Sequence, residues 1–283
     1  MLGPAQIDQY RSDGYTVVPQ FFRGDELSRM LSEIERISRG STLAQHDGAR
    51  IEMEPDQPPG GTAVRRIYEP CAYYPCFREL SESEKLLDTV EQLLGPDLEF
   101  HYSKINMKPP AIGSLVDWHQ DLAYYPLTNS DSVSILIYLD DAGRNNGCVQ
   151  VIPGRHRTKP MDHTRNGYFQ GRISELVDET QAVALEAPSG SVIFMHCLTP
   201  HASIANTSNR PRRTLILSYR ASDAYPVYAG EGTLAAEAHV RQVRGVKRRL
   251  ARFSFTEFPI PRQRQHTKSL YELQELSRQE QNA

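Results

Sequence analysis

Hydrophobic positions recur at helical spacing in two segments of the N-terminal third. In residues 25–39 the apolar side chains form one stripe: Leu27, Met30, Leu31, Ile34 and Ile37. Residues 83–94 repeat this pattern and end at Gly95-Pro96, a typical helix stop. Because residues three or four apart share a helix face, both segments are predicted to be amphipathic helices. A short helix over 5–13 and a strand over 15–18 are predicted before them.

The pattern changes between residues 98 and 220, where short apolar runs alternate with turn residues. These runs are LEFHYSKINMK, SVSILIYLDD, GCVQVIPG, AVALEAP, GSVIFMHC and RRTLILSYR. Short strands at this spacing indicate a sandwich or barrel rather than alternating βαβ units. We therefore predict a mainly β fold with flanking helices, whose core is a cupin-like jelly-roll, or double-stranded β-helix.

One domain is predicted over residues 1–283, since sandwiches and barrels of this size often form a single domain. Its parts are a helical N-terminal part (about 1–97), the jelly-roll core (about 98–225) and a helical C-terminal extension (about 226–283). The extension ends in an amphipathic segment around Leu270, Leu273 and Leu276. Residues 44–63 are polar and rich in Pro and Gly, and are predicted to form a mobile loop that could act as a lid.

Composition narrows the function classes. A net charge of −3 and a pI near 6.3 give no reason to expect nucleic-acid binding. Basic residues between 241 and 252 are predicted to be a solvated helix face. No apolar run approaches the roughly 18 residues of a membrane span, and the N-terminus lacks the apolar core of a signal peptide. We expect a cytoplasmic protein, monomer or homodimer, without a membrane or nucleic-acid partner.

The cysteines do not suggest a disulfide scaffold. There are four in a chain of 283 residues, namely Cys71, Cys76, Cys148 and Cys197. Disulfide scaffolds are typical of much shorter secreted chains. The thiols are therefore predicted to be buried or incidental, in a reducing setting.

A His-x-Asp pair is the first candidate for chemistry. His119 and Asp121, in DWHQDLAYYP, are two residues apart, so on a β-strand their side chains point to the same face. Two imidazoles and one carboxylate on one side of a metal form the facial triad of non-haem Fe(II) oxygenases. His201, in PHASIAN, is the preferred second imidazole. His196 competes with it, although its apolar neighbours favour a structural role. Alternatively, His119 and Asp121 form a plain hydrogen-bonded pair and His201 is a core histidine.

Arg212 is the candidate for binding an anionic co-substrate. A dicarboxylate that chelates iron at one end needs a fixed cation at the other, and a guanidinium binds carboxylate bidentately and stays charged when buried. Strand alternation places one set of side chains on a common face: Arg212, Thr214, Ile216, Ser218 and Arg220. Arg213 becomes the candidate if the register slips by one. An edge strand whose arginines reach solvent would show the same alternation.

These segments resemble the phytanoyl-CoA dioxygenase family of Fe(II)/2-oxoglutarate oxygenases. The similarity runs from DQYRSDGYTVV to about Tyr225, and its specific parts are WHQDLAYYP, RNNGCVQVIPGRHR and HASIANTSNRPRR. The resemblance implies that iron is held by His119, Asp121 and His201. Halogenating relatives replace the carboxylate with a small residue, so Asp121 argues for hydroxylation or another oxidative outcome.

The resemblance also implies the co-substrate contacts. Arg212 matches the arginine that binds the distal carboxylate of 2-oxoglutarate, and Ser203 matches a serine that assists it. Lys104 and Asn106 lie on the strand whose inward side chains contact 2-oxoglutarate or substrate. Gly147 and Gly154 are interpreted as turn glycines. The implied cofactors are Fe(II), 2-oxoglutarate and O2.

The expected activity is hydroxylation of an unactivated C–H bond in a small metabolite or acyl-type substrate, with release of succinate and CO2. Candidate substrate contacts are Tyr124, Tyr125, Ile216 and Arg220. Arg66 and Lys108 could offer positive charge to an acidic substrate, but solvated surface charge explains them equally well. Two alternatives are a cupin-like metal-dependent dioxygenase that does not use 2-oxoglutarate, and a non-catalytic metal- or ligand-binding homologue.

Overall fold

Two antiparallel sheets form the core of the molecule. The computed structural model describes residues 1–113, 115–227, 237–260, 262 and 270–282. Its main sheet has this strand order: β1 (Tyr15–Val18), β11 (Val192–His196), β6 (Ser132–Tyr138), β13 (Arg212–Ala221), β4 (Leu98–Lys108), β3 (Val64–Tyr68) and β2 (Ile51–Met53). A further strand, β14 (Arg241–Arg244), also pairs with β4. The long central strands β4, β6 and β13 correspond to apolar runs from which strands were predicted.

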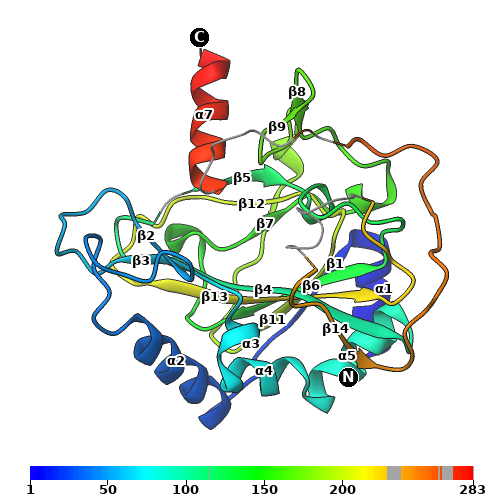
Figure 1. Cartoon of the computed structure of the whole chain (residues 1–283), viewed down its shortest axis with the longest axis horizontal. Helices are drawn as coiled ribbons and strands as arrows, with labels where there is room; N and C mark the ends of the chain where they lie inside the picture. Colours follow the sequence, from blue (N-terminus) through cyan, green and yellow to red (C-terminus); the bar gives the residue numbers. More distant parts are fainter. Residues whose placement is uncertain (114, 228–236, 261, 263–269, 283) are drawn as a thin grey trace.

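A smaller sheet lies over one face of the main sheet (Figure 1). Its order is β10 (Val183–Ala184), β7 (Gln150–Val151), β12 (His201–Ser203) and β5 (Val116–His119). Two facing antiparallel sheets of this kind are a jelly-roll arrangement, so the predicted fold class is confirmed. A separate hairpin pairs β8 (Thr164–Arg165) with β9 (Tyr168–Phe169).

Helices cover the opposite face of the main sheet (Figure 1). The helices on this face are α2 (Asp25–Ser38), α3 (Pro70–Tyr73), α4 (Pro75–Ser81) and α5 (Glu84–Leu94), while α1 (Pro4–Asp13) lies beside β1 (Figure 1). Buried side chains of α2 and α5, such as Ile34 and Leu86, pack in one cluster with Leu215, Leu217 and Tyr219 of β13. The helices predicted over 25–39 and 83–94 are confirmed. The other face of β13 is therefore left to the smaller sheet and to the space between the sheets.

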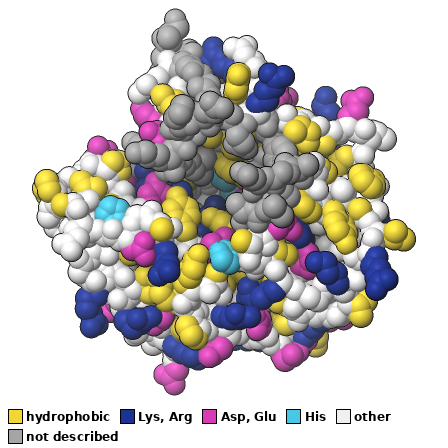
Figure 2. All heavy atoms as spheres, viewed as in Figure 1, with side chains coloured by type: hydrophobic (Ala, Val, Ile, Leu, Met, Phe, Trp, Pro, Cys, Tyr) yellow, Lys and Arg dark blue, Asp and Glu magenta, His cyan; other side chains and the backbone are white. Residues whose placement is uncertain are grey.

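The predicted helical extension after residue 226 is wrong for the described residues 237–260. Residues 241–244 form strand β14, and the helix found in the described part of this region is α7 (Leu270–Asn282). The basic residues form ion pairs instead of a solvated helix face: Arg244 bonds Asp88 and Glu91 at 2.7 Å. Figure 2 shows the same intermingling of Lys and Arg with Asp and Glu on one face.

Residues 44–63 are not simply a loop. They contain β2, which pairs with β3 at the edge of the main sheet. Met53 and Glu54 are buried, and the backbone N–H of Ala44 donates to the carbonyl of Pro59 at 2.9 Å. The prediction of one continuous loop is therefore wrong at residues 51–53, while the mobility of the segment and its role as a lid stay predictions.

Two further expectations can be compared with the described residues. The four cysteines are free thiols, and Cys71, Cys148 and Cys197 are buried, as predicted. Within the described part of the chain, no helix has the length and apolar character needed to cross a bilayer.

Three-residue 3₁₀ helices complete the fold. They are η1 (Asp121–Ala123), η2 (Arg144–Asn146), η3 (Arg155–Arg157) and η4 (Glu179–Gln181). The first of them carries one of the candidate ligands.

Candidate active site

Strand pairing brings two histidines together from distant parts of the chain. His119 is the last residue of β5, His201 is the first of β12, and the two are direct partners in the antiparallel ladder. Their ring centroids are 4.0 Å apart. Pairing of β5 with β12 in the smaller sheet thus brings together two motifs that lie far apart in the sequence.

Asp121 joins this pair by a route that the sequence pattern did not predict. Strand β5 ends at His119, and Asp121 begins the 3₁₀ helix η1, so the two residues do not share a strand. Gln120 between them is extended (φ −115°, ψ 133°), which still directs both side chains to one side. The Asp121 Oδ1 atom lies 3.9 Å from His119 Nε2 and 3.8 Å from His201 Nε2.

Hydrogen bonds orient each of the three side chains. The Nδ1 atom of His119 donates to the Asp117 carbonyl at 2.8 Å, and that of His201 donates to the Thr199 carbonyl at 3.0 Å. These bonds leave both Nε2 lone pairs directed to the centre. The Ser134 hydroxyl donates to Asp121 Oδ2 at 2.5 Å, which leaves Oδ1 free.

The chemistry of this centre suits a metal ion. The candidate ligand atoms of the three residues all lie within 4.8 Å of one another. Burial lowers the pKa of both His119 and His201, which keeps the imidazoles neutral and able to donate an electron pair. Two imidazole nitrogens and one carboxylate oxygen are the donor set of mononuclear non-haem iron.

The competing histidine, His196, points elsewhere. Its Nδ1 atom accepts the N–H of Leu198 at 3.1 Å, and its ring packs 5.1 Å from that of His156. These contacts give His196, the last residue of β11 in the main sheet, a structural position.

A cavity of about 650 Å³ opens beside the three side chains, between the two sheets. Most of the sequence-predicted site residues line it: Lys104, Asn106, His119, Asp121, Tyr124, Tyr125, His201, Ser203, Arg212 and Ile216. Of the predicted alternating face of β13, the members Arg212, Thr214, Ile216 and Ser218 face this cavity.

Arg212 lies in this cavity without an acidic partner among the described residues. It is 3% exposed, and it donates to the Thr214 hydroxyl at 2.9 Å and to the Gly147 carbonyl at 2.5 Å. Its Nε atom is buried and has no hydrogen-bond partner. A buried guanidinium that contacts neutral groups alone is costly unless an anion joins it.

Comparison with known proteins decides the family. A model of the family "Phytanoyl-CoA dioxygenase (PhyH)" matches residues 10–214. The chain belongs to the phytanoyl-CoA dioxygenase family. It is accordingly an enzyme of the iron- and 2-oxoglutarate-dependent dioxygenase class.

Relatives of this dioxygenase are similar over most of their length. A "Probable alpha-ketoglutarate-dependent hypophosphite dioxygenase" of Stutzerimonas stutzeri is 35% identical over 229 residues, which cover 78% of this chain and 80% of that protein. An "Ectoine dioxygenase" of Bordetella bronchiseptica is 26% identical over 241 residues, covering 78% and 76%. The crystal structure of EctD from S. alaskensis with 2-oxoglutarate and 5-hydroxyectoine gives a TM-score of 0.64 at 26% identity, covering 78% and 77%.

Lys108 and Arg66 of this dioxygenase are buried, so the interpretation as surface charge is wrong. They are 4% and 5% exposed, and both line the cavity. Lys108 is the ladder partner of Arg212 and donates to the Ile204 carbonyl at 2.5 Å. The sequence could have indicated that Lys108 is buried at the cavity. Strand alternation places Lys104, Asn106 and Lys108 on one face of β4, which is the inward face.

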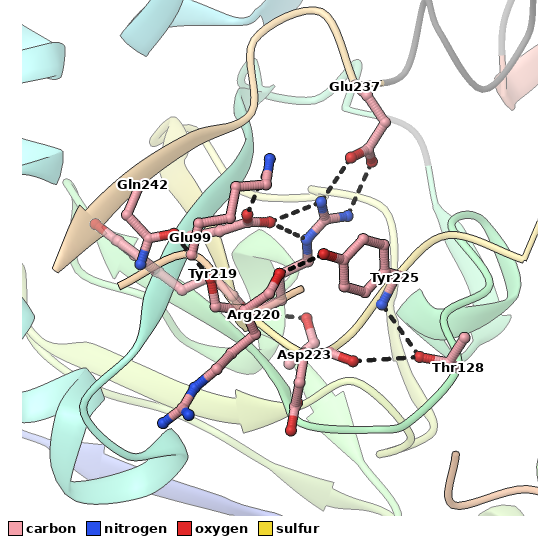
Figure 3. Close-up of polar contacts among 12 residues, drawn as sticks. Glu99, Thr128, Tyr219, Arg220, Asp223, Tyr225, Glu237 and Gln242 are labelled. Atoms are coloured by element: carbon pink, nitrogen blue, oxygen red, sulfur yellow. Dashed lines mark hydrogen bonds and ion pairs between the residues drawn. The ribbon is translucent and has the colours of Figure 1, made fainter. Parts of the chain in front are cut away.

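Arg220, predicted to contact substrate, does not line the cavity. Figure 3 shows its guanidinium between Glu99, at 2.8 Å, and Glu237, at 2.6 Å. Its strand face was predicted correctly, but it lies beyond the end of the cavity and its charge is already neutralised. Arg213 is on the other face and pairs with Asp140 at 2.7 Å, so the register did not slip.

The two tyrosines after the His-x-Asp pair form a wall of the cavity. The Tyr124 ring packs edge-on 5.4 Å from that of His119, and its hydroxyl donates to the Gly171 carbonyl at 2.5 Å. Tyr125 packs edge-on 4.5 Å from His101.

Two contributors could not be singled out from the sequence. Ser134 is one of two serines in the mainly apolar strand β6, and the sequence does not show which of them meets a ligand. Gly147 was interpreted as a turn glycine, and its left-handed φ of 78° agrees with that interpretation. Its carbonyl additionally holds Arg212, and a Cβ there would lie 2.4 Å from the Ile204 carbonyl oxygen. Only the folded chain shows these contacts.

Proposed function

We propose that this dioxygenase hydroxylates a small molecule, with iron held by His119, Asp121 and His201, and 2-oxoglutarate anchored by Arg212. The observation that carries the proposal is the buried guanidinium of Arg212, without an acidic partner among the described residues, in the same cavity as the three ligands. A dicarboxylate supplies the missing anion at one end and metal-chelating oxygens at the other.

The residues fit the cofactors. A facial set of three donors leaves positions open for a co-substrate and O2. When bound, iron and 2-oxoglutarate supply the oxidising chemistry, in which O2 converts 2-oxoglutarate to succinate and CO2 and a C–H bond is hydroxylated. The protein's contribution is to orient the reactants and exclude water.

The chain's own groups divide these tasks. Thr214 and Gly147 fix the guanidinium of Arg212, and Ser203 and Lys108 lie at the same end of the cavity. Apolar side chains form other parts of the wall and limit access of water to the reacting centre. They are Val116, Leu136, Val149, Met195 and Ile216.

The substrate is proposed to be a small molecule, as hypophosphite and ectoine are for the enzymes named after them. Tyr124, Tyr125 and Ile216 are proposed to border it, and Asn106 to contact substrate or co-substrate. A cupin-like dioxygenase that does not use 2-oxoglutarate gives no reason for a buried cation without a counterion at Arg212. The cytoplasmic location, the monomeric or dimeric state and the single domain stay predictions from sequence.

The test is formation of succinate from 2-oxoglutarate and its dependence on added Fe(II). His201→Ala should abolish both metal binding and succinate formation, because one of three ligands is lost. His196→Asn is the matched control, since Asn can still accept the Leu198 N–H, and it should keep both. Metal binding that survives His201→Ala but not His196→Asn would contradict the assignment.

A further inference from the structure

The cavity has a second cationic site, apart from the Arg212 end. Along β13, Arg212 is the ladder partner of Lys108, whereas Lys104 is the partner of Ile216. The two lysines are four residues apart on β4, which separates their backbones by about 13 Å. Lys104 therefore lies well along the cavity from the Arg212 end.

The ammonium group of Lys104 is available for a ligand. Lys104 lines the cavity and forms no hydrogen bond or ion pair with a described residue, and its ring contact is with Tyr102, 5.8 Å from the centroid. Burial lowers the pKa of Lys104 to about 8, while the charge of Asp121 acts to raise it. The side chain thus stays largely protonated at neutral pH.

The neighbouring charged groups are already engaged. Arg66 bonds Glu52 at 3.1 Å and donates from Nε to Asn106 Oδ1 at 3.0 Å. This bond leaves the amide NH2 of Asn106 available at the cavity. Glu69 also lines the cavity, but it accepts hydrogen bonds from Ser103 and forms no ion pair with Lys104.

Charge balance indicates what Lys104 binds. In the loaded site, the charges of ferrous iron and Arg212 are balanced by Asp121 and the two carboxylates of 2-oxoglutarate. Lys104 is then a positive charge beside the metal centre, enclosed by protein and without an ion pair to a described residue. Buried charges in proteins are normally paired.

We infer that the substrate is a small oxyanion, such as a carboxylate or a phosphonate, and that Lys104 binds its charged group. The inference rests on the proposed function, because it requires 2-oxoglutarate to occupy the Arg212 end. The amide of Asn106 offers a hydrogen bond to the same group. The substrate is small because one cavity of about 650 Å³ has to hold both molecules.

Binding to the full-length protein loaded with Ni(II), a redox-inert substitute for iron, tests this inference. The first titration adds 2-oxoglutarate. The second adds methylphosphonate, and a parallel one adds methanesulfonamide, which has a similar tetrahedral shape but no charge. The variants are Lys104→Met, which removes the charge with little change in volume, and Lys104→Arg, which keeps the charge.

Methylphosphonate should bind the wild type at least about tenfold more tightly than methanesulfonamide. Lys104→Met should lose this preference, Lys104→Arg should keep part of it, and the affinity for 2-oxoglutarate should change less than about twofold in both. Equal binding of the two probes by the wild type would overturn the inference. So would a Lys104→Met variant that weakens 2-oxoglutarate but keeps the preference, because Lys104 would then belong to the co-substrate site. Failure of the first titration in the wild type would instead overturn the proposed function, and this inference with it.

Discussion

Two arginines on one strand of this protein have the same burial and opposite surroundings. Arg212 and Arg220 are each 3% exposed and lie on the same face of β13. Arg220 is held by two carboxylates, Glu99 and Glu237 (Figure 3). Arg212 contacts a hydroxyl and a backbone carbonyl, and part of its guanidinium has no partner.

The difference distinguishes a buried charge that stabilises the fold from a buried charge that binds a ligand. A buried ion pair is complete within the folded chain, so its removal affects stability. A buried cation without an acid is incomplete until a ligand binds, so its removal should affect affinity. Strand alternation places both arginines on one face but does not reveal which has a counterion.

The largest expected effect is the loss of 2-oxoglutarate affinity when Arg212 is replaced. Arg212→Met should weaken 2-oxoglutarate binding by about 1,000-fold, or about 4 kcal/mol, since a buried charge pair of the complex loses one partner. The ligand-free protein should keep its melting temperature, because an unpaired buried charge has been removed. Calorimetry on the Ni(II)-loaded protein measures the affinity. Arg213→Met, on the opposite face of β13, is the control that should bind normally. If Arg212→Met lowered stability but kept normal affinity for 2-oxoglutarate, Arg212 would have a structural role like that of Arg220.

Arg220→Met should show the converse behaviour. Its loss leaves Glu99 buried without its main partner, and we expect a loss of about 3 kcal/mol in the free energy of unfolding. Urea titration measures this loss, and affinity for 2-oxoglutarate should stay within about twofold of the wild type. Adding Glu99→Leu should recover part of the stability, because the stranded carboxylate is then gone. Weakened 2-oxoglutarate binding in Arg220→Met would mean that both arginines serve the cavity.

Glu69 is the acidic analogue of Arg212 in this comparison. It is a largely buried carboxyl group without an ion pair among the described residues. Burial raises its pKa from 4.5 to about 7. The raised value means that ionisation destabilises the folded state, fully above about pH 7 and not at all below about pH 4.5. Glu69→Gln should therefore stabilise the protein by about 1–2 kcal/mol at pH 8.5 and leave it unchanged at pH 4.5.

Melting temperatures at the two pH values measure this difference. Glu257→Gln, at an exposed position, is the matched control for the same change of side chain. A stabilisation by Glu69→Gln that is the same at both pH values would contradict the explanation.

The last prediction concerns the hydroxyl that orients Asp121. Ser134→Ala removes the 2.5 Å hydrogen bond to Asp121 Oδ2 and should lower metal affinity by about 10–100-fold, without abolishing binding. Ser132→Ala is the control on the same strand, since its hydroxyl donates to the Tyr219 carbonyl and not to a ligand. Equal metal affinity in both variants would show that Asp121 needs no such support.

Most of the fold and much of the site could be predicted from the sequence. The 98–108 and 212–220 strands and the amphipathic helices follow from local periodicity, whereas the convergence of His119, Asp121, His201 and Arg212 was implied by the family resemblance. Features set by distant contacts could not be predicted. Strand β14 forms ion pairs with α5, and residues 51–53 pair with β3. Arg220 forms an ion pair with Glu237, which comes from a later segment of the chain. Periodicity gives the face of a residue but not its partner.

The central claim is that one metal ion and one dicarboxylate share the cavity between His119, Asp121, His201 and Arg212. Anomalous diffraction at the iron edge, from anaerobic crystals grown with Fe(II) and 2-oxoglutarate, tests it most directly. The account predicts one iron peak in bonding distance of both Nε2 atoms and Asp121 Oδ1, with the far carboxylate of 2-oxoglutarate on the guanidinium of Arg212. Iron bound elsewhere, or that carboxylate on Lys104 with Arg212 left without an anion, would contradict it.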